Sequence, residues 1–181
     1  YDTVRSLFWA TGAALMVRPA DWNAAGGFDA RFFAHFEEID FCWRLRARAR
    51  KIVCVTDSVV YHVGGGTLPA DNPRKTYLNF RNSLTMLYKN LPDDELQHVL
   101  SVRKWLDAMA WFKFFVSGDF ANAKAVRRAR KDFHKWQHQF DPERKKNLEN
   151  TTLFDIPERI QRSLIYAFYV QGKKTFAQFM S

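Results

Sequence analysis

The chain has 181 residues, of which 47% are hydrophobic and 26% are charged, and its formal net charge is +9. This composition is typical of a globular protein with a buried core and excludes a disordered chain. Cys42 and Cys54 suggest neither a disulfide framework nor a zinc site, and no signal-peptide pattern opens the sequence. A reducing cytoplasm is therefore the expected compartment.

The first third of the chain alternates short β-rich runs with helical patterns. The runs cover residues 7–17, 52–55 and 58–63, and Gly26-Gly27 marks a turn between them. A helix is expected to begin near Glu37. This alternation predicts an α/β region over residues 1–68.

The rest of the chain, residues 69–181, has helical periodicity. Helices are expected over residues 75–90, 94–116, 119–140 and 157–180. Pro92-Asp93 and Gly118-Asp119 provide stop and cap signals between three of them. The sequence therefore predicts an all-helical region after the α/β region.

Three carboxylates gather at the expected start of the helix near Glu37. Glu37, Glu38 and Asp40 lie within one turn, and such crowding costs free energy unless a cation, a proton or a substrate hydroxyl uses it. Asp40 and Arg44 have the i, i+4 spacing of a helical ion pair. By itself the cluster also suits a capped helix start with a surface ion pair, and His62 by itself suits a structural role.

A second feature is a basic and aromatic segment. Residues 121–146 contain nine Lys or Arg and three Asp or Glu, and the apolar run at 108–116 is too short to span a bilayer, which needs about 20 residues. This pattern fits a non-catalytic helical module at an anionic membrane surface, or simply the core and solvated face of a helical bundle. We expect no nucleic-acid partner, because no RNP string, zinc-finger spacing or helix-turn-helix is recognisable.

The motif string over residues 11–68 resembles the second half of the catalytic domain in family 2 inverting glycosyltransferases, which have the GT-A fold. Bacterial members that add rhamnose and other sugars to surface polysaccharides are most similar. Residues 74–92 are also similar to the next segment of those proteins. The resemblance implies half of a GT-A fold, a nucleotide-sugar donor, and a glycan or lipid-linked acceptor.

The resemblance also assigns roles to individual residues. Glu38 matches the general base, although most family members have Asp there, so Glu37 stays an alternative. Asp40 and Arg44 match groups that orient the site and the substrate. His62 matches a histidine that contacts the metal, Mg or Mn, or the nucleotide diphosphate. The small-residue turn beside the sugar-binding cleft is matched by Thr11, Gly12 and Ala13.

The sequence departs from the family in one respect. It contains no Asp-x-Asp motif for the divalent cation and no preceding βαβ half for the nucleotide, and it does not start with Met. Asp93-Asp94 follows Pro92 and is a helix cap. We therefore expect the C-terminal part of a longer enzyme, peripheral at the inner face of the cytoplasmic membrane, which is inactive without its N-terminal half.

Overall fold

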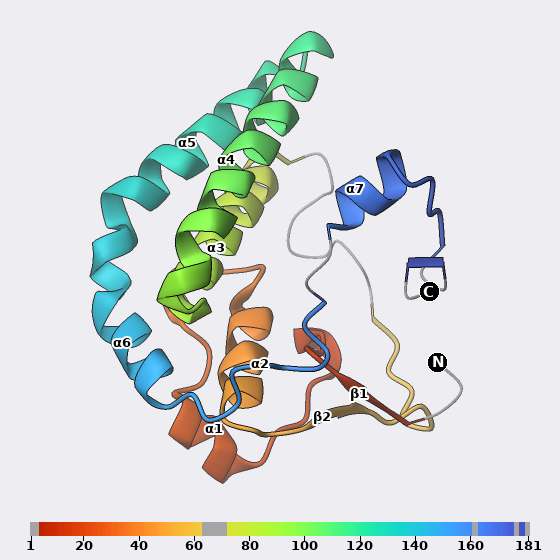
Figure 1. Ribbon diagram of the computed structural model, residues 1–181, viewed down its shortest axis with the longest axis vertical. Coiled ribbons are helices and arrows are strands. Elements are labelled where there is room, and N and C mark those ends of the chain that lie inside the picture. Colours follow the sequence, from red (N-terminus) through yellow and green to blue (C-terminus); the bar gives the residue numbers. More distant parts are fainter. Residues whose placement is uncertain (1–3, 63–71, 161–162, 176–177, 180–181) are drawn as a thin grey trace.

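The computed structural model describes residues 4–62, 72–160, 163–175 and 178–179. The elements in chain order are β1 (Arg5–Leu7), η1 (Gly12–Ala14), α1 (Pro19–Ala25), η2 (Ala30–Phe32), α2 (Glu37–Ala47), β2 (Ile52–Cys54), α3 (Pro73–Asn90), α4 (Asp93–Val116), α5 (Phe120–Trp136), η3 (Gln137–Phe140), α6 (Asp141–Glu149) and α7 (Leu164–Tyr169). Figure 1 shows that helices make up most of the molecule.

The expected α/β region with half of a GT-A fold is wrong. The sheet in the described residues has only two strands, β1 and β2, which pair antiparallel with Arg5 opposite Cys54. The run at 7–17 does not form a strand: β1 ends at Leu7, η1 follows, and Pro19 begins α1. A short apolar run becomes a strand only where a neighbouring strand pairs with its backbone N–H and C=O groups. The run itself does not reveal that neighbour.

The other β-rich runs have mixed outcomes. The run at 52–55 is confirmed as β2. Residues 58–62 form no strand, and residue 63 lies outside the described part of the chain. The expected boundary at residue 68 and the three glycines at 64–66 also lie outside it.

The long helices were largely predictable. The expected helices at 75–90 and 94–116 are confirmed as α3 and α4, and the one at 119–140 is α5 followed by the short helix η3. The helix expected over 157–180 is wrong, because residues 157–160 are not helical and α7 has six residues. α6 was not anticipated.

The main hydrophobic core lies where α2, α3 and α4 meet. Its buried side chains come from η2, these three helices and the segment after α6. They are Phe32, Trp43, Met86, Leu91, Leu96 and Ile156. A second cluster joins α1 to α2 through Ala25, Phe41 and Leu45, with Trp22 packed against it. α2 is therefore fixed on two sides by apolar contacts.

α4 and α5 form an antiparallel hairpin that packs against α3 (Figure 1). Gly118, with φ of 78°, makes the turn, and the Asp119 carboxylate accepts a hydrogen bond from Asn122 N at 3.1 Å to begin α5. The far end of the hairpin extends beyond α3. No helix in the described residues is long and apolar enough to cross a membrane.

Candidate functional site

The acidic cluster begins α2, as expected. Glu37 and Glu38 are half-buried in its first turn. In each, Oε2 is shielded from solvent and has no hydrogen-bond partner among the described residues, and the same holds for Nε2 of His35. Buried polar atoms are normally satisfied, so three orphaned atoms within four residues mark a place where a ligand could supply the missing partners.

The small-residue turn lies against this cluster. A Cβ built on Gly12, in η1, would stand 3.7 Å from Cβ of Glu38. Thr11 and Ala13, on either side, are exposed. The structure thus brings the expected cleft residue Gly12 next to the expected base Glu38.

The surroundings of Glu38 change its acidity. Burial raises the pKa of Glu38, and the adjacent Glu37 carboxylate raises this pKa further, while backbone N–H groups of the helix start lower it only in part. A carboxylate with a raised pKa is a better proton acceptor than an ordinary surface glutamate. Glu38 therefore has the properties of a general base.

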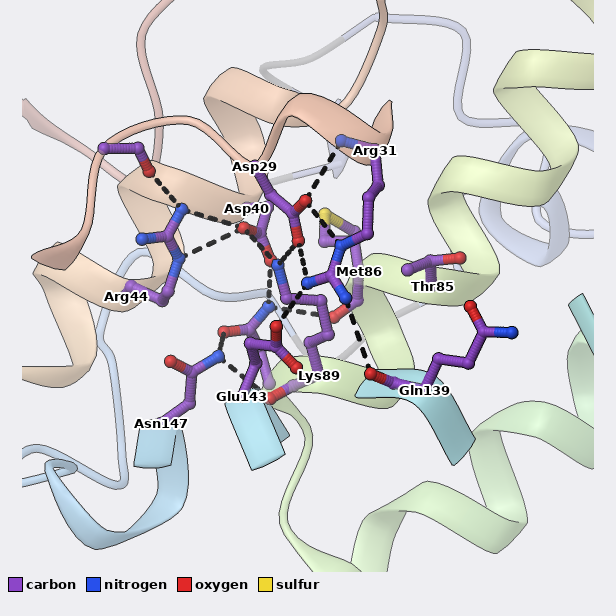
Figure 2. Close-up of polar contacts among 12 residues, drawn as sticks. Asp29, Arg31, Asp40, Arg44, Thr85, Met86, Lys89, Gln139, Glu143 and Asn147 are labelled. Carbon is purple, nitrogen blue, oxygen red and sulfur yellow. Dashed lines mark hydrogen bonds and ion pairs between the residues drawn. The ribbon is translucent and has the colours of Figure 1, made fainter. Parts of the chain in front are cut away.

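Asp40 differs from its neighbours, because its side chain is 0% exposed and fully satisfied. The Asp40 carboxylate accepts hydrogen bonds from Nε and Nη2 of Arg44, from Nζ of Lys89 at 3.0 Å and from Nδ2 of Asn90 at 2.8 Å (Figure 2). The expected ion pair with Arg44 is confirmed at 2.9 Å. Arg44 itself is buried and donates to the backbone carbonyls of Ala25 and Gly27. Both side chains therefore hold α2 in place.

Lys89 connects this pair to a second acidic residue. Its ammonium group is buried between Asp40 and Asp29, with Nζ 2.9 Å from the Asp29 carboxylate. Arg31 binds the same carboxylate and reaches Glu143 of α6 at 2.6 Å (Figure 2). Burial by itself would raise the pKa of Asp29, but hydrogen bonds from Arg31 and Lys89 hold this pKa well below its usual range.

His62, the expected metal ligand, lies apart from any group of metal-binding side chains in the described residues. His62 is exposed, in a segment after β2 that forms neither helix nor strand. Within the described ranges, no three His, Cys, Asp or Glu side chains lie close enough together to hold a metal ion. The resemblance places the main ligands of the divalent cation in the N-terminal half, and we derive no catalytic step through the cation.

The backbone just before Glu37 is strained. Phe33, His35 and Phe36 have φ of 67°, 68° and 72°, values that side-chain-bearing residues rarely adopt. Ala34 N donates to Phe32 O at 2.8 Å, so residues 32–34 form a γ-turn of the rare positive-φ kind. Such strain concentrates at functional sites, where the surrounding structure enforces it.

Asp29, Lys89 and Asn82 also surround the cluster, and no motif in the sequence pointed to them. One signal was present: Leu78, Asn82, Met86 and Lys89 follow one face of α3, so polar residues interrupt a buried stripe. The strained backbone left no sequence signal, because positive φ is normally expected of glycine. Comparison with protein-family models, curated proteins and solved structures gives no match for this chain.

Proposed function

We propose that this chain carries the catalytic base of an inverting glycosyltransferase, which moves a sugar from a nucleotide-sugar donor to a hydroxyl of a glycan or lipid-linked acceptor in cell-surface polysaccharide synthesis. The state of Glu38 carries the proposal: its pKa is raised, one of its carboxylate oxygens has no hydrogen-bond partner among the described residues, and it lies beside Gly12. The resemblance of residues 11–68 supports sugar transfer as the chemistry.

In this reaction the acceptor hydroxyl attacks the anomeric carbon as the bond to the nucleotide diphosphate breaks. Glu38 takes the hydroxyl proton while the new bond forms, which contributes on the order of 10²–10⁴-fold to the rate. The adjacent Glu37 raises the pKa of the base. We assign the base to Glu38 rather than Glu37 because the resemblance matches Glu38 to the base and because burial raises the pKa of Glu38.

The resemblance assigns donor binding to an N-terminal half of the enzyme, so the test uses the full-length polypeptide. Transfer of a labelled sugar is measured from a set of nucleotide sugars to short glycans and lipid-linked saccharides. Glu38→Gln should lower kcat by about two orders of magnitude or more, because an amide cannot accept the proton. Glu149→Gln, an exposed change at the end of α6, is the control and should leave transfer unchanged.

Two outcomes would contradict the assignment. If Glu37→Gln abolishes transfer and Glu38→Gln retains it, the base is Glu37. If both variants transfer sugar at the normal rate, neither carboxylate is the base, and the proposed function loses its main support.

A separate observation favours a peripheral position at the inner face of the cytoplasmic membrane. The α4–α5 hairpin exposes large apolar side chains along α4 and at its tip, and exposes cations along α5. The apolar group comprises Val102, Trp105, Met109, Phe112, Phe115, Val116 and Phe120. The cationic group comprises Lys124, Arg127, Arg128 and Lys131. Apolar side chains beside cations suit an anionic lipid surface.

The geometry of α4 makes this apolar surface continuous. Val102, Trp105, Met109, Phe112 and Val116 are spaced by three or four residues, so they form one stripe along the helix. Arg130 is not part of the cationic group, because its guanidinium lies 2.6 Å from the buried Asp107 carboxylate and joins the two helices. The positive charge of Arg130 therefore pairs with Asp107 between α4 and α5.

Cosedimentation of the 181-residue chain with vesicles tests this position. Binding to vesicles with anionic lipid should be strong at low salt and fall as ionic strength rises. Changing Lys124, Arg127, Arg128 and Lys131 to Gln should reduce it, since each nearby cation contributes roughly 1 kcal/mol. A control with the same charge change away from the hairpin alters Arg18, Lys51, Lys173 and Lys174. Equal binding to neutral and anionic vesicles, or equal loss in both variants, would contradict docking through the hairpin.

A further inference from the structure

One side chain of α3 holds the strained backbone that precedes the acidic pair. Asn82 is 1% exposed, and its Nδ2 lies 3.0 Å from Phe32 O, 2.8 Å from Ala34 O and 2.7 Å from His35 O. An amide group has two N–H donors, so three carbonyls share them. Asn82 thus binds two carbonyls of the γ-turn, Phe32 O and Ala34 O, and also the carbonyl of His35, which lies two positions before Glu37.

Arg81 supports this arrangement from the neighbouring position. Its Nη2 donates to Arg31 O at 2.9 Å and to Phe32 O at 3.1 Å. Arg81 Nε and Nη2 also donate to Oδ1 of Asn82 at 2.9 and 2.7 Å. The guanidinium thus fixes which end of the Asn82 amide faces the strained backbone.

The strained segment needs such support. Each residue held at an unfavourable φ costs on the order of 1–3 kcal/mol, and three of the four residues from Phe33 to Phe36 are in this state. The N-cap of α2 is Phe36, which offers no side-chain cap to the helix. Without external hydrogen bonds the segment would relax toward negative φ, and the first turn of α2, with Glu37 and Glu38, would move with it.

We propose that Asn82 is a positioning residue for the acidic pair, which acts through residues 32–36 and is itself oriented by Arg81. This inference rests on the proposed function, because it assigns a purpose to the orientation of Glu38. The chemistry selects asparagine: Asp would face three carbonyls with no donor, Ala would remove the donor to Ala34 O and His35 O, and Gln is one methylene longer in a buried site.

The experiment uses the 181-residue chain and does not depend on transfer. Carbon-13 NMR of the side-chain carboxyl groups gives the pKa of Glu38, and backbone carbon shifts of residues 33–36 report their φ region. In Asn82→Ala the pKa of Glu38 should fall toward the ordinary value of 4.5, and the shifts of Phe33, His35 and Phe36 should leave the positive-φ pattern. The pKa falls because a released helix start exposes the carboxylate to water.

Asn147→Ala is the matched control. Asn147 is also a buried asparagine, and its Nδ2 donates to Lys89 O and Asn90 Oδ1, both at 3.2 Å, away from the strained segment. This variant should lose stability while it keeps the Glu38 pKa and the shifts of residues 33–36. If Asn82→Ala behaves like Asn147→Ala in both measurements, Asn82 is only structural and the proposal is overturned.

A milder change covers the case in which Asn82→Ala does not fold. Arg81→Gln removes donors from a half-buried side chain and should shift the same signals in the same direction by a smaller amount. Unchanged signals in this variant would also overturn the proposal. Failure of the proposed function is distinguishable: Glu38→Gln would then retain transfer in the full-length enzyme, whatever the NMR of the Asn82 variants shows.

Discussion

Glu38 and Asp40 are two residues apart in one helical turn, yet their carboxylates have opposite surroundings. Asp40 faces the core and accepts hydrogen bonds from Arg44, Lys89 and Asn90. Glu38 has an oxygen with no hydrogen-bond partner in the described part of the chain, and burial raises its pKa. The same side-chain chemistry therefore serves packing at one position and is free for proton transfer at the other, as the local environment decides.

The first prediction concerns the cost of keeping Glu38 unpaired. Because the folded state raises the pKa of Glu38, protonated Glu38 contributes stability that is fully present below the ordinary value of 4.5 and is lost as pH rises through the folded value. Glu38→Gln should therefore raise the melting temperature at pH 7.5 and change it little at pH 4. Thermal melts at the two pH values measure this, with Glu149→Gln as the exposed control. A lower melting temperature at pH 7.5 would show that the Glu38 carboxylate stabilises the fold.

The second prediction concerns Lys89. Its removal in Lys89→Met leaves the Asp29 and Asp40 carboxylates without their shared cation, and breaking a buried ion pair costs about 3–5 kcal/mol. Urea unfolding followed by circular dichroism gives the loss, and the exposed Lys135→Met should change stability by less than about 0.5 kcal/mol. A loss below about 1 kcal/mol in Lys89→Met would mean that water or Arg44 and Arg31 replace the ammonium group.

At the scale of single elements, α2 is unusual at both ends. Its N-terminus follows the strained segment, and its C-terminus closes with Ala49 in the left-handed region at φ of 58°. Ala49 N donates to Arg46 O at 2.9 Å, and Arg50 N donates to Leu45 O at 3.0 Å. This pair of bonds forms a Schellman motif, in which glycine normally occupies the position of Ala49.

The third prediction follows from that motif. Ala49→Gly should stabilise the protein by about 0.5–1 kcal/mol, because glycine adopts positive φ without the steric cost that alanine carries. Chemical denaturation measures the gain. Ala108→Gly, an exposed change in the middle of α4, should instead destabilise by about 1 kcal/mol. A loss of stability in Ala49→Gly would contradict the left-handed assignment.

The elements that could be predicted are those with local signals. Periodicity predicted the two long helices, and the expected cap at Asp119 is confirmed for α5. The expected Asp cap of α4 is wrong, because its N-cap is Pro92, which offers the helix no side-chain cap. The run at 52–55 predicted β2, but β1 could not be predicted in the same way. β1 pairs with β2 across more than forty residues of chain, and neither run contains information about the other.

The candidate site was only partly predictable for the same reason. The spacing of Asp40 and Arg44 predicted their ion pair, because i, i+4 contacts are local. Lys89 and Asn82 reach α2 and its preceding segment from about 50 residues away, and no spacing rule connects them. The predicted fold class is wrong because Gly12 and Pro19 begin helices in and just after the apolar run at 7–17, which therefore forms no long strand.

At the scale of the whole molecule, ion pairs join segments that are distant in sequence, and those of Lys89 are buried. Arg31 of η2 binds Glu143 of α6, and Lys89 of α3 binds Asp29 and Asp40. Arg46 of α2 binds Glu158 after α6. Among these carboxylates Asp29 has a lowered pKa, so stability should depend on pH through Asp29.

The fourth prediction is a steep loss of stability in acid to which Asp29 contributes. Its folded pKa is lowered, so its contribution is present above the ordinary value of 3.8 and is lost as pH falls below that value toward the folded one. Asp29→Asn should destabilise the protein more at pH 7 than at pH 3, as measured by urea unfolding at both pH values. Asp57→Asn, at an exposed site, is the control. An equal effect of Asp29→Asn at the two pH values would contradict the lowered pKa.

The anchoring of α2 has a consequence for chain connectivity. Ala47 O, at the end of α2, accepts hydrogen bonds from Thr152 N at 2.8 Å and Leu153 N at 2.9 Å, while Asn82 and Lys89 hold the other end. All of these partners come from beyond residue 72, so the covalent link through residues 63–71 is not what keeps α2 in place. Two separate polypeptides, 1–66 and 67–181, should therefore reassemble when refolded together and elute as one complex.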